Sequence, residues 1–301
     1  MCVVWSESLK GSVEKVHEFR QDIVNSIVSN LELQISLNEA RLARVATPER
    51  LDAWSMFHLG LQHLHRFNRD DNFRAEELFS QVQSMAPEFA RGHAAMSCAH
   101  FQNAFLRYRE NKQEEIARAS ELAQKAIDLD PLDPFANFAK GRSLVLHQDL
   151  EGAKVWLDRA IDLSPNYAQG IYARAWTGVL SCNPEEAIQF SDHAISLSPL
   201  DPLLYAMYGT KGFANMISGD MDAAVHWTEK AVRAPGAHVL IVAMAVLMNI
   251  LKGDDKQARY WLQNIRAQGA PMTSEFFLQA FPFQDPGVRQ KVRDAFALYD
   301  M

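Results

Sequence analysis

The chain has 301 residues, of which 48% are hydrophobic and 22% charged, and its formal net charge is −7. This balance is typical of a folded, water-soluble protein, and the acidic excess argues against direct nucleic-acid binding, which needs a basic surface. The longest apolar run, residues 239–248, is about half a membrane span. Cys2, Cys98 and Cys182 lie far apart without a CxxC motif, as in a reducing compartment. We therefore expect a cytoplasmic protein that has no membrane partner.

Residues 1–10 alternate between apolar and polar side chains as in a β-strand, with Val3 and Trp5 on one face. Apolar residues then recur at helical spacing to about residue 43. A single strand leaves its backbone groups unpaired, so it must pair with something else. We expect either a fragment of a larger protein or a homodimer in which Cys2–Ser8 pairs between two chains.

Residues 47–131 predict two helix pairs, each ended by a proline, Pro87 or Pro131. Both pairs are longer than those that follow. The small and apolar positions at i, i+4 and i+7 of their second helices are Ala75, Phe79 and Val82, then Ala119, Ala123 and Ala126. The first pair also holds a histidine cluster that includes His58. Zinc sites favour histidines at i and i+4, and this spacing does not occur in the cluster. We therefore expect these histidines to be solvated or hydrogen-bonded.

The most regular part of the chain repeats every 34 residues between residues 119 and 199. The series that keep this period are Ala119, Ala153 and Ala187; Ala126, Ala160 and Ala194; Pro131, Pro165 and Pro199; and Gly141 with Ala175. Such a period indicates stacked helix–turn–helix units. Small residues are needed where two antiparallel helices cross closely, and proline ends the second helix because it cannot donate a hydrogen bond. One pair cannot bury its own apolar face, so the units must stack.

Residues 200–271 predict two further pairs, in which Gly212 stands twelve residues before Ala224, as Gly141 stands before Ala153. A short helix, a turn and a final helix follow. The apolar stripe of the final helix is Val288, Val292, Phe296 and Tyr299. A helix with one apolar and one polar face is suited to close the end of a repeat array.

The repeat resembles the tetratricopeptide repeat, whose signature has a small residue in the first helix and then alanine, an apolar residue, alanine and proline. Those positions are filled by Gly141, Ala153, Leu157, Ala160 and Pro165. The resemblance implies an all-α fold, a right-handed superhelix of about six helix pairs. We expect three parts: a strand and a long helix over residues 1–46, the solenoid over 47–271, and capping helices over 272–301.

Residues 3–35 resemble the last strand and helix of a TolB-like domain. The stretch FPFQDPGVRQ resembles the terminus of repeat regions that are linked to nucleotide cyclases. In bacterial nucleotide cyclases and winged-helix transcription regulators, a TolB-like domain precedes tetratricopeptide repeats. The resemblance implies a regulatory module of bacterial signalling or transcription control, with the cyclase or DNA-binding domain outside these 301 residues.

In tetratricopeptide proteins, one face of each first helix lines the concave groove of the superhelix. By this resemblance, the predicted groove residues are Phe101, Phe135, Phe138, Arg142, Tyr172, Trp176 and Phe213. Aromatic groups in a groove can anchor an extended peptide or an amphipathic helix. Two alternatives stay open: these side chains pack against adjacent helices, or a segment of the chain itself fills the groove.

No residue pattern predicts catalysis, a metal site or a cofactor. The stretch YGTKGFAN lacks the spacing of a phosphate loop, and Cys182 has no accompanying His-Asp arrangement. The sequence therefore predicts a non-enzymatic scaffold that binds a protein or peptide partner in its concave groove. A small-molecule-sensing solenoid is the alternative, which a closed cavity near Phe138, Tyr172 and Trp176 would favour. An enzyme of unrecognised type would require buried ionisable groups clustered in a closed pocket.

Overall fold

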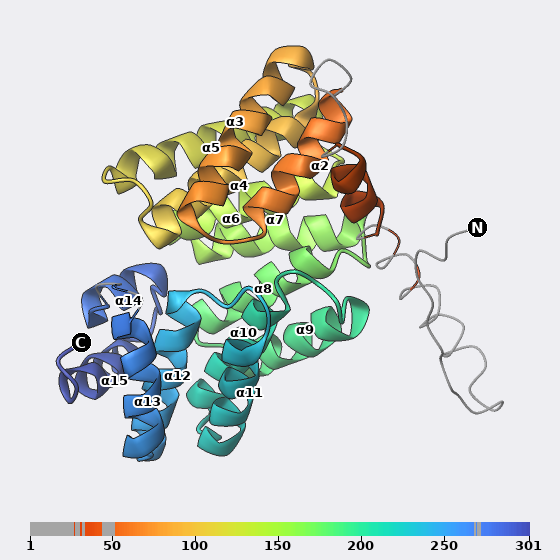
Figure 1. The fold of residues 1–301 in the computed structure, drawn as a ribbon. Helices are drawn as coiled ribbons and strands as arrows, with labels where there is room; N and C mark the ends of the chain where they lie inside the picture. Colours follow the sequence, from red (N-terminus) through yellow and green to blue (C-terminus); the bar gives the residue numbers. More distant parts are fainter. Residues whose placement is uncertain (1–26, 28–30, 32–33, 44–51, 268, 270–271) are drawn as a thin grey trace, which may run out of the picture.

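The computed structural model describes residues 27, 31, 34–43, 52–267, 269 and 272–301, and all regular secondary structure in this part is helical (Figure 1). The all-α fold predicted from the repeat is thus confirmed. Residues 34–43 are helical, and the strand predicted at Cys2–Ser8 lies outside the described residues. The helices that follow are α2 (Ala53–Leu64), α3 (Arg69–Met85), α4 (Ala90–Leu106), α5 (Lys112–Leu129), α6 (Pro134–Leu146), α7 (Leu150–Leu163), α8 (Ala168–Leu180), α9 (Pro184–Leu197), α10 (Leu204–Ser218), α11 (Met221–Arg233), α12 (Val239–Lys252), α13 (Asp255–Ala267), α14 (Ser274–Ala280) and α15 (Pro286–Ala297).

Consecutive helices from α2 to α13 pack as hairpins that stack on one another. The even-numbered helices form the inner layer, since each contacts the next even-numbered helix from α2 to α12. The odd-numbered helices lie outside, and each from α3 to α11 contacts both its hairpin partner and the following even-numbered helix. In this described part, no helix has the length and apolar character that a membrane crossing requires.

The crossing of α6 and α7 shows why small residues repeat. A Cβ atom added to Gly141 would lie 2.6 Å from Cγ of Leu157 and 3.2 Å from the carbonyl oxygen of Ala153. Ala153 and Ala160 are fully buried at the same contact. The predicted packing of Gly141 against Ala153 is therefore confirmed, and any larger side chain at this crossing would push the two helices apart.

The C-terminal segment folds back onto the middle of the repeat array. α14 contacts α4, and α15 contacts α12 (Figure 1). Between α14 and α15, Phe281 and Phe283 are 4% and 0% exposed, and the backbone N–H of Gln284 donates to the carbonyl of Leu180 at 2.8 Å. This segment therefore reaches the inner helices as well as the end of the array.

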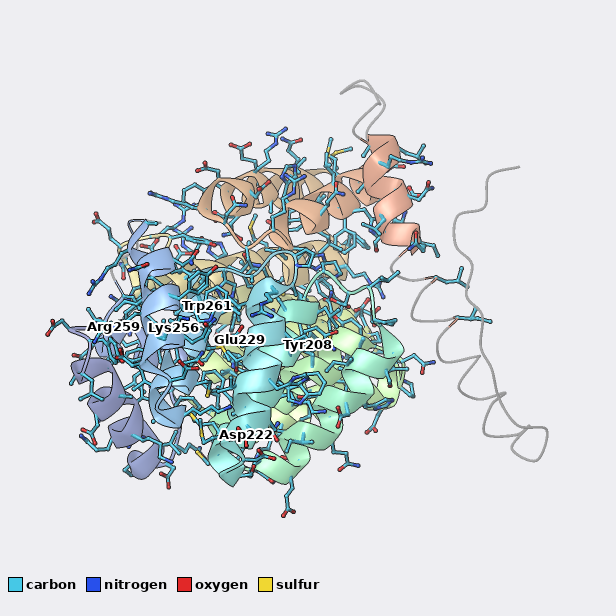
Figure 2. All side chains as sticks on the ribbon, turned by 60° about the horizontal axis from the view of Figure 1, so that its bottom comes forward. Tyr208, Asp222, Glu229, Lys256, Arg259 and Trp261 are labelled. Atoms are coloured by element: carbon cyan, nitrogen blue, oxygen red, sulfur yellow. The ribbon has the colours of Figure 1, made fainter. Side chains whose placement is uncertain are left out.

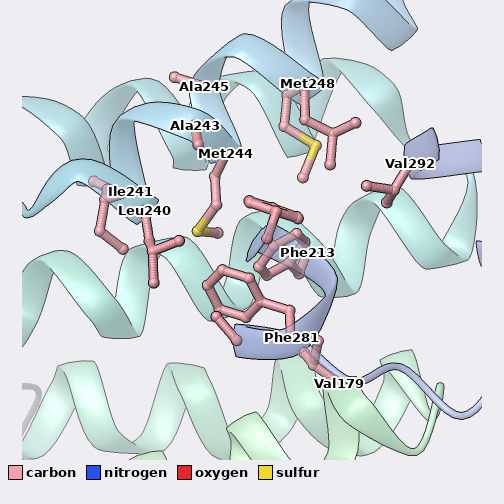
Figure 3. Close-up of a cluster of buried hydrophobic side chains, with 14 of the residues drawn as sticks. Val179, Phe213, Leu240, Ile241, Ala243, Met244, Ala245, Met248, Phe281 and Val292 are labelled. Carbon is pink, nitrogen blue, oxygen red and sulfur yellow. The ribbon is translucent and has the colours of Figure 1, made fainter. Parts of the chain in front are cut away.

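The largest apolar core forms where α8, α10 and α12 meet the C-terminal segment. Phe213 of α10 lies against Phe281, with ring centroids 4.9 Å apart, and Met244 of α12 lies beside them (Figure 3). A second core fills the space among α2 to α7. Phe101, Trp176 and Phe213 of the first core face the candidate site on the inner layer.

Candidate functional site

A small chamber lies at the centre of the concave face, with a volume of about 30 Å³. We call it the central chamber. The structure brings together there five of the seven predicted groove residues, Phe101, Arg142, Tyr172, Trp176 and Phe213, together with Phe67, Phe105, Tyr205, Thr210, His238, Ile241, Met244 and Phe281. The five predicted residues come from α4, α6, α8 and α10, so successive inner helices bring them together. Residues of α12 and of the C-terminal segment complete the wall.

The walls of the central chamber are packed aromatic rings. The centroid of Trp176 lies 6.0 Å from that of Phe101 and 5.8 Å from that of Phe105, in edge-to-face arrangements. Phe101 and Phe213 are 2% and 1% exposed, and Phe281 of the C-terminal segment completes the wall. Packing against adjacent helices and filling by a segment of the chain therefore both occur at this part of the predicted groove.

Three polar groups of the central chamber lack a hydrogen-bond or ion-pair partner among the described residues. The guanidinium of Arg142 lies 3.8 Å above the ring of Phe101, and within the described residues it forms neither an ion pair nor a hydrogen bond. The hydroxyl of Tyr205, a residue with no exposed surface, and Nδ1 of His238 also lack hydrogen-bond partners in that part of the chain. Arg142 is half-buried, whereas the Tyr205 hydroxyl and Nδ1 of His238 are buried atoms. Buried polar groups are normally bonded, so these two atoms indicate a missing partner.

A larger cavity of about 340 Å³ lies at the amino-terminal ends of α6 and α8. We call it the α2 cavity, because Trp54, Phe57, His58, Leu61, Gln62 and His65 of the α2 region line one side of it. The opposite side is formed by the start of α6 with Phe135, the start of α8 with Tyr167 and Gln169, and the turn before α10 with Asp201; residues 35–37 also line it. Of the predicted groove residues, Phe135 lines this cavity, and Phe138 stacks behind it with ring centroids 5.8 Å apart.

His58 is the most unusual residue of the α2 cavity. It is 4% exposed, and neither of its ring nitrogens has a hydrogen-bond partner within the described chain. Burial, and next the charge of Arg91, lower the pKa of His58 to about 4. The ring is therefore neutral at neutral pH, with one nitrogen as a donor and the other as an acceptor. The expectation that the histidines of the first pair are solvated or hydrogen-bonded is wrong for His58, because its place on α2 turns it inward.

The rest of the α2 cavity combines apolar rings with one carboxyl group. Trp54 is 41% exposed and meets His58 edge-on, with ring centroids 4.3 Å apart. Asp201, at the opposite side, accepts a hydrogen bond from the backbone N–H of Leu203 at 2.8 Å, and burial raises the pKa of its carboxyl group. An apolar group with hydrogen-bonding atoms could therefore be held between these walls.

Two other polar regions of the described structure have their bonding capacity met. On the outer face, Glu229 of α11 accepts from Trp261 at 2.7 Å and from Gln257 at 3.3 Å, near Tyr208 (Figure 2). Between α4 and α5, Glu115 accepts from Asn103 at 2.7 Å and pairs with His100 at 2.6 Å. This buried cluster lines none of the cavities above, so it stabilises the contact between helices.

Trp54, His58, Tyr205 and His238 are not among the predicted groove residues. Trp54 lies in the first turn of α2, and His238 precedes α12 in a linker. Only a histidine or tyrosine in an otherwise apolar inner-helix pattern signals such a site, and the sequence does not show which of these groups lacks a partner.

Comparisons with known proteins address the fold. No family model matches the chain. A segment of 151 residues, 50% of this chain, is 21% identical to the putative adenylate cyclase 3 of Rhizobium meliloti (strain 1021), and the match spans 26% of that protein.

Several solved structures superpose on much of the chain. TTC0263, a thermophilic TPR protein of Thermus thermophilus, covers 65% of this chain and 98% of its own, at 15% identity and a TM-score of 0.51. The match to the APC/C hetero-tetramer Cut9-Hcn1 covers 89% of this chain and 46% of the other chain, at 15% identity and a TM-score of 0.56. The match to the human IFIT1 dimer with PPP-AAAA covers 72% of this chain and 50% of the other chain, at 14% identity and a TM-score of 0.58. At these identities the similarity concerns the fold, and the fold of this chain is of the tetratricopeptide-repeat type.

Proposed function

We propose that the protein is a non-enzymatic scaffold that binds an extended peptide segment of a protein partner in the α2 cavity. The observation that carries this proposal is His58, which is nearly fully buried with two unpaired ring nitrogens in the wall of an aromatic-lined cavity. An unsatisfied buried polar group costs about 1–3 kcal/mol. A ligand that forms hydrogen bonds with both nitrogens removes that cost. The unpaired nitrogens of the free protein therefore favour binding of such a ligand.

An extended peptide fits these groups. The neutral ring of His58 offers one donor and one acceptor, which match the carbonyl and the N–H of a peptide backbone. Trp54, Phe135 and Tyr167 surround the space beside His58 and would hold an apolar side chain of the peptide. Apolar anchors combined with backbone hydrogen bonds are a recurring mode of peptide recognition.

The predicted groove residues take two roles in this proposal. Phe135 contacts the peptide directly, and Phe138 supports it from behind. The other five, Phe101, Arg142, Tyr172, Trp176 and Phe213, form the central chamber deeper in the concave face. We further propose that the scaffold is a cytoplasmic regulatory module of bacterial signalling or transcription control. The partial match to the putative adenylate cyclase supports the signalling role.

Selection of peptides from a random library on the full chain, followed by fluorescence anisotropy of the selected peptides, tests the proposal. His58→Phe keeps a ring of similar shape and removes both nitrogens. We expect it to weaken the selected peptides about tenfold or more, and to raise the melting temperature because an unsatisfied group is removed. Trp54→Ala should weaken the same peptides, and Tyr260→Ala, at a 52% exposed aromatic of α13, serves as the control. Peptides that bind both cavity variants as tightly as the unmodified chain would contradict the proposal.

A further inference from the structure

The central chamber holds an unbalanced charge. Arg142 lies on its wall, and no described carboxylate is within ion-pairing distance of the guanidinium. Its contacts are the rings of Phe101 at 3.8 Å and Phe138 at 5.4 Å. Aromatic faces attract a cation but do not neutralise it. The guanidinium is half-buried, so an anion that enters the chamber can pair with it where little water competes.

The neighbouring groups are neutral and present hydrogen-bonding atoms. Burial lowers the pKa of His238 to about 3 and raises the pKa of Tyr205, so both groups are uncharged near neutral pH. The Tyr205 hydroxyl and Nδ1 of His238 have no partner in the described part of the chain. The carboxyl group of Asp201 accepts from the Leu203 N–H instead. The chamber therefore has one formal positive charge and at least one free donor, the Tyr205 hydroxyl.

Size and polarity narrow the class of anion. The chamber volume is about 30 Å³, and about 10–15 Å³ of such volume accommodates one water molecule. A group of a few atoms fits, and a large metabolite does not. Phe213, Met244 and Phe281 make one side of the chamber apolar (Figure 3). A doubly charged phosphate would leave one charge uncompensated against these walls, whereas a carboxylate carries one charge and can bear a short apolar tail.

We propose that the central chamber binds a small monocarboxylate, which pairs with Arg142 and accepts a hydrogen bond from the Tyr205 hydroxyl, with His238 as a further hydrogen-bonding partner. This site is separate from the α2 cavity and does not depend on peptide binding there. The chamber walls come from α4, α6, α8, α10 and α12 and from Phe281 of the C-terminal segment. Occupation of the chamber therefore ties the C-terminal segment to the inner helices, and the carboxylate stabilises the closed arrangement.

The test uses the full chain with sodium acetate, propionate and butyrate as probes, each followed by thermal melting and by titration calorimetry. Sodium chloride at equal ionic strength, neutral acetamide and inorganic phosphate are the comparison ligands. We expect at least one acid to raise the melting temperature and to give a saturable binding heat, and the comparison ligands to do neither. No effect from any of the acids, or a stronger effect from phosphate than from the acids, would overturn the proposal.

Variants locate the site and distinguish binding from packing. Arg142→Met keeps the long side chain without the charge and should abolish the carboxylate effect. Arg159→Met is the matched control, because Arg159 also stacks on an aromatic ring, Trp156 at 5.8 Å, but on an exposed helix face. Retention of full carboxylate binding by Arg142→Met would contradict the assignment.

Tyr205→Phe keeps the proposal testable if Arg142→Met does not fold. It removes an unpaired hydroxyl, so the ligand-free stability should stay the same or rise while carboxylate affinity falls about tenfold. An unchanged affinity would remove Tyr205 from the site. His58→Phe should leave carboxylate binding unaltered. A result against peptide binding in the α2 cavity can therefore be distinguished from a result against carboxylate binding in the central chamber.

Discussion

The backbone N–H of Gln284 donates a 2.8 Å hydrogen bond to the carbonyl of Leu180, the last residue of α8. This bond joins the C-terminal segment to the middle of the repeat array. The adjacent Phe283 has no exposed surface. The chain after the last repeat pair is therefore part of the core on the concave side, and its removal would expose the inner helices.

The first prediction concerns Phe281 in this segment. Its ring is 4% exposed and lies 4.9 Å from Phe213 and 5.8 Å from Phe105, between centroids. Phe281→Ala should lower the free energy of unfolding by about 3–5 kcal/mol, because it removes apolar contacts from α4 and α10 together. Urea denaturation measures the loss. Leu298→Ala, at a residue that is 73% exposed, should cost little. Equal effects of the two variants would place Phe281 outside the common core.

The second prediction compares two glycines on successive inner helices. A Cβ at Gly141 would lie 2.6 Å from Cγ of Leu157, whereas a Cβ at Gly178 would meet nothing closer than 3.4 Å. Gly178→Ala should therefore stabilise the protein by up to about 1 kcal/mol through helix propensity. Gly141→Ala should destabilise it by about 1–3 kcal/mol through overpacking. Leu157→Ala added to Gly141→Ala should relieve the clash, and a double-mutant cycle in urea measures the coupling.

The sequence predicts the hairpins well and the site only in part. The small residues that recur with Gly141 are required by local helix crossings, and such local contacts leave a regular trace in the sequence. The convergence of Phe101, Trp176 and Phe213 follows from the same register. The position of Phe281 depends instead on where a non-repeating segment returns after several stacked pairs, which no local spacing specifies. Whether His58 has a bonding partner also depends on contacts distant in the chain.

The third prediction concerns pH and three inner-face histidines. Burial lowers the pKa of His58 and His65 to about 4 and that of His238 to about 3, from an ordinary value of 6.5. Between pH 6.5 and about 4, the unfolded chain binds protons that the folded chain does not bind. Stability is therefore lost as the pH falls through this window, by at most about 1.4 kcal/mol per pH unit for each histidine. Asp201, whose pKa is raised by burial, acts in the opposite sense just above pH 3.8.

Urea denaturation at about pH 7, 6 and 5 measures this dependence. His58→Phe should reduce the slope, because one proton-linked group is removed. His226→Gln is the control, since His226 is exposed. A slope that His58→Phe leaves unchanged would show that His58 is protonated equally in the folded and unfolded chains.

The last prediction contrasts a buried arginine with an exposed one. Arg174 of α8, whose side chain is 7% exposed, donates to Asp158 of α7 at 2.7 Å and also pairs with Glu186 of α9, so it links two hairpins. Both carboxylates keep contact with water, at 50% and 24% exposure, and they remain solvated when the arginine is removed. Arg174→Met should therefore cost about 1–3 kcal/mol, less than the loss of a partner from a fully buried pair.

Arg259 of α13 provides the comparison (Figure 2). It pairs with Asp255 at 2.8 Å, with both side chains more than half exposed, at 64% and 61%. Arg259→Met should cost less than about 1 kcal/mol, and this small effect should shrink in high salt. The cost of Arg174→Met should persist in high salt, because α7, α8 and α9 shield the guanidinium. Urea denaturation of both variants, with and without added salt, measures the two losses of stability. If the two losses are equal and equally sensitive to salt, Arg174 acts as an ordinary surface ion pair and does not hold the hairpins together.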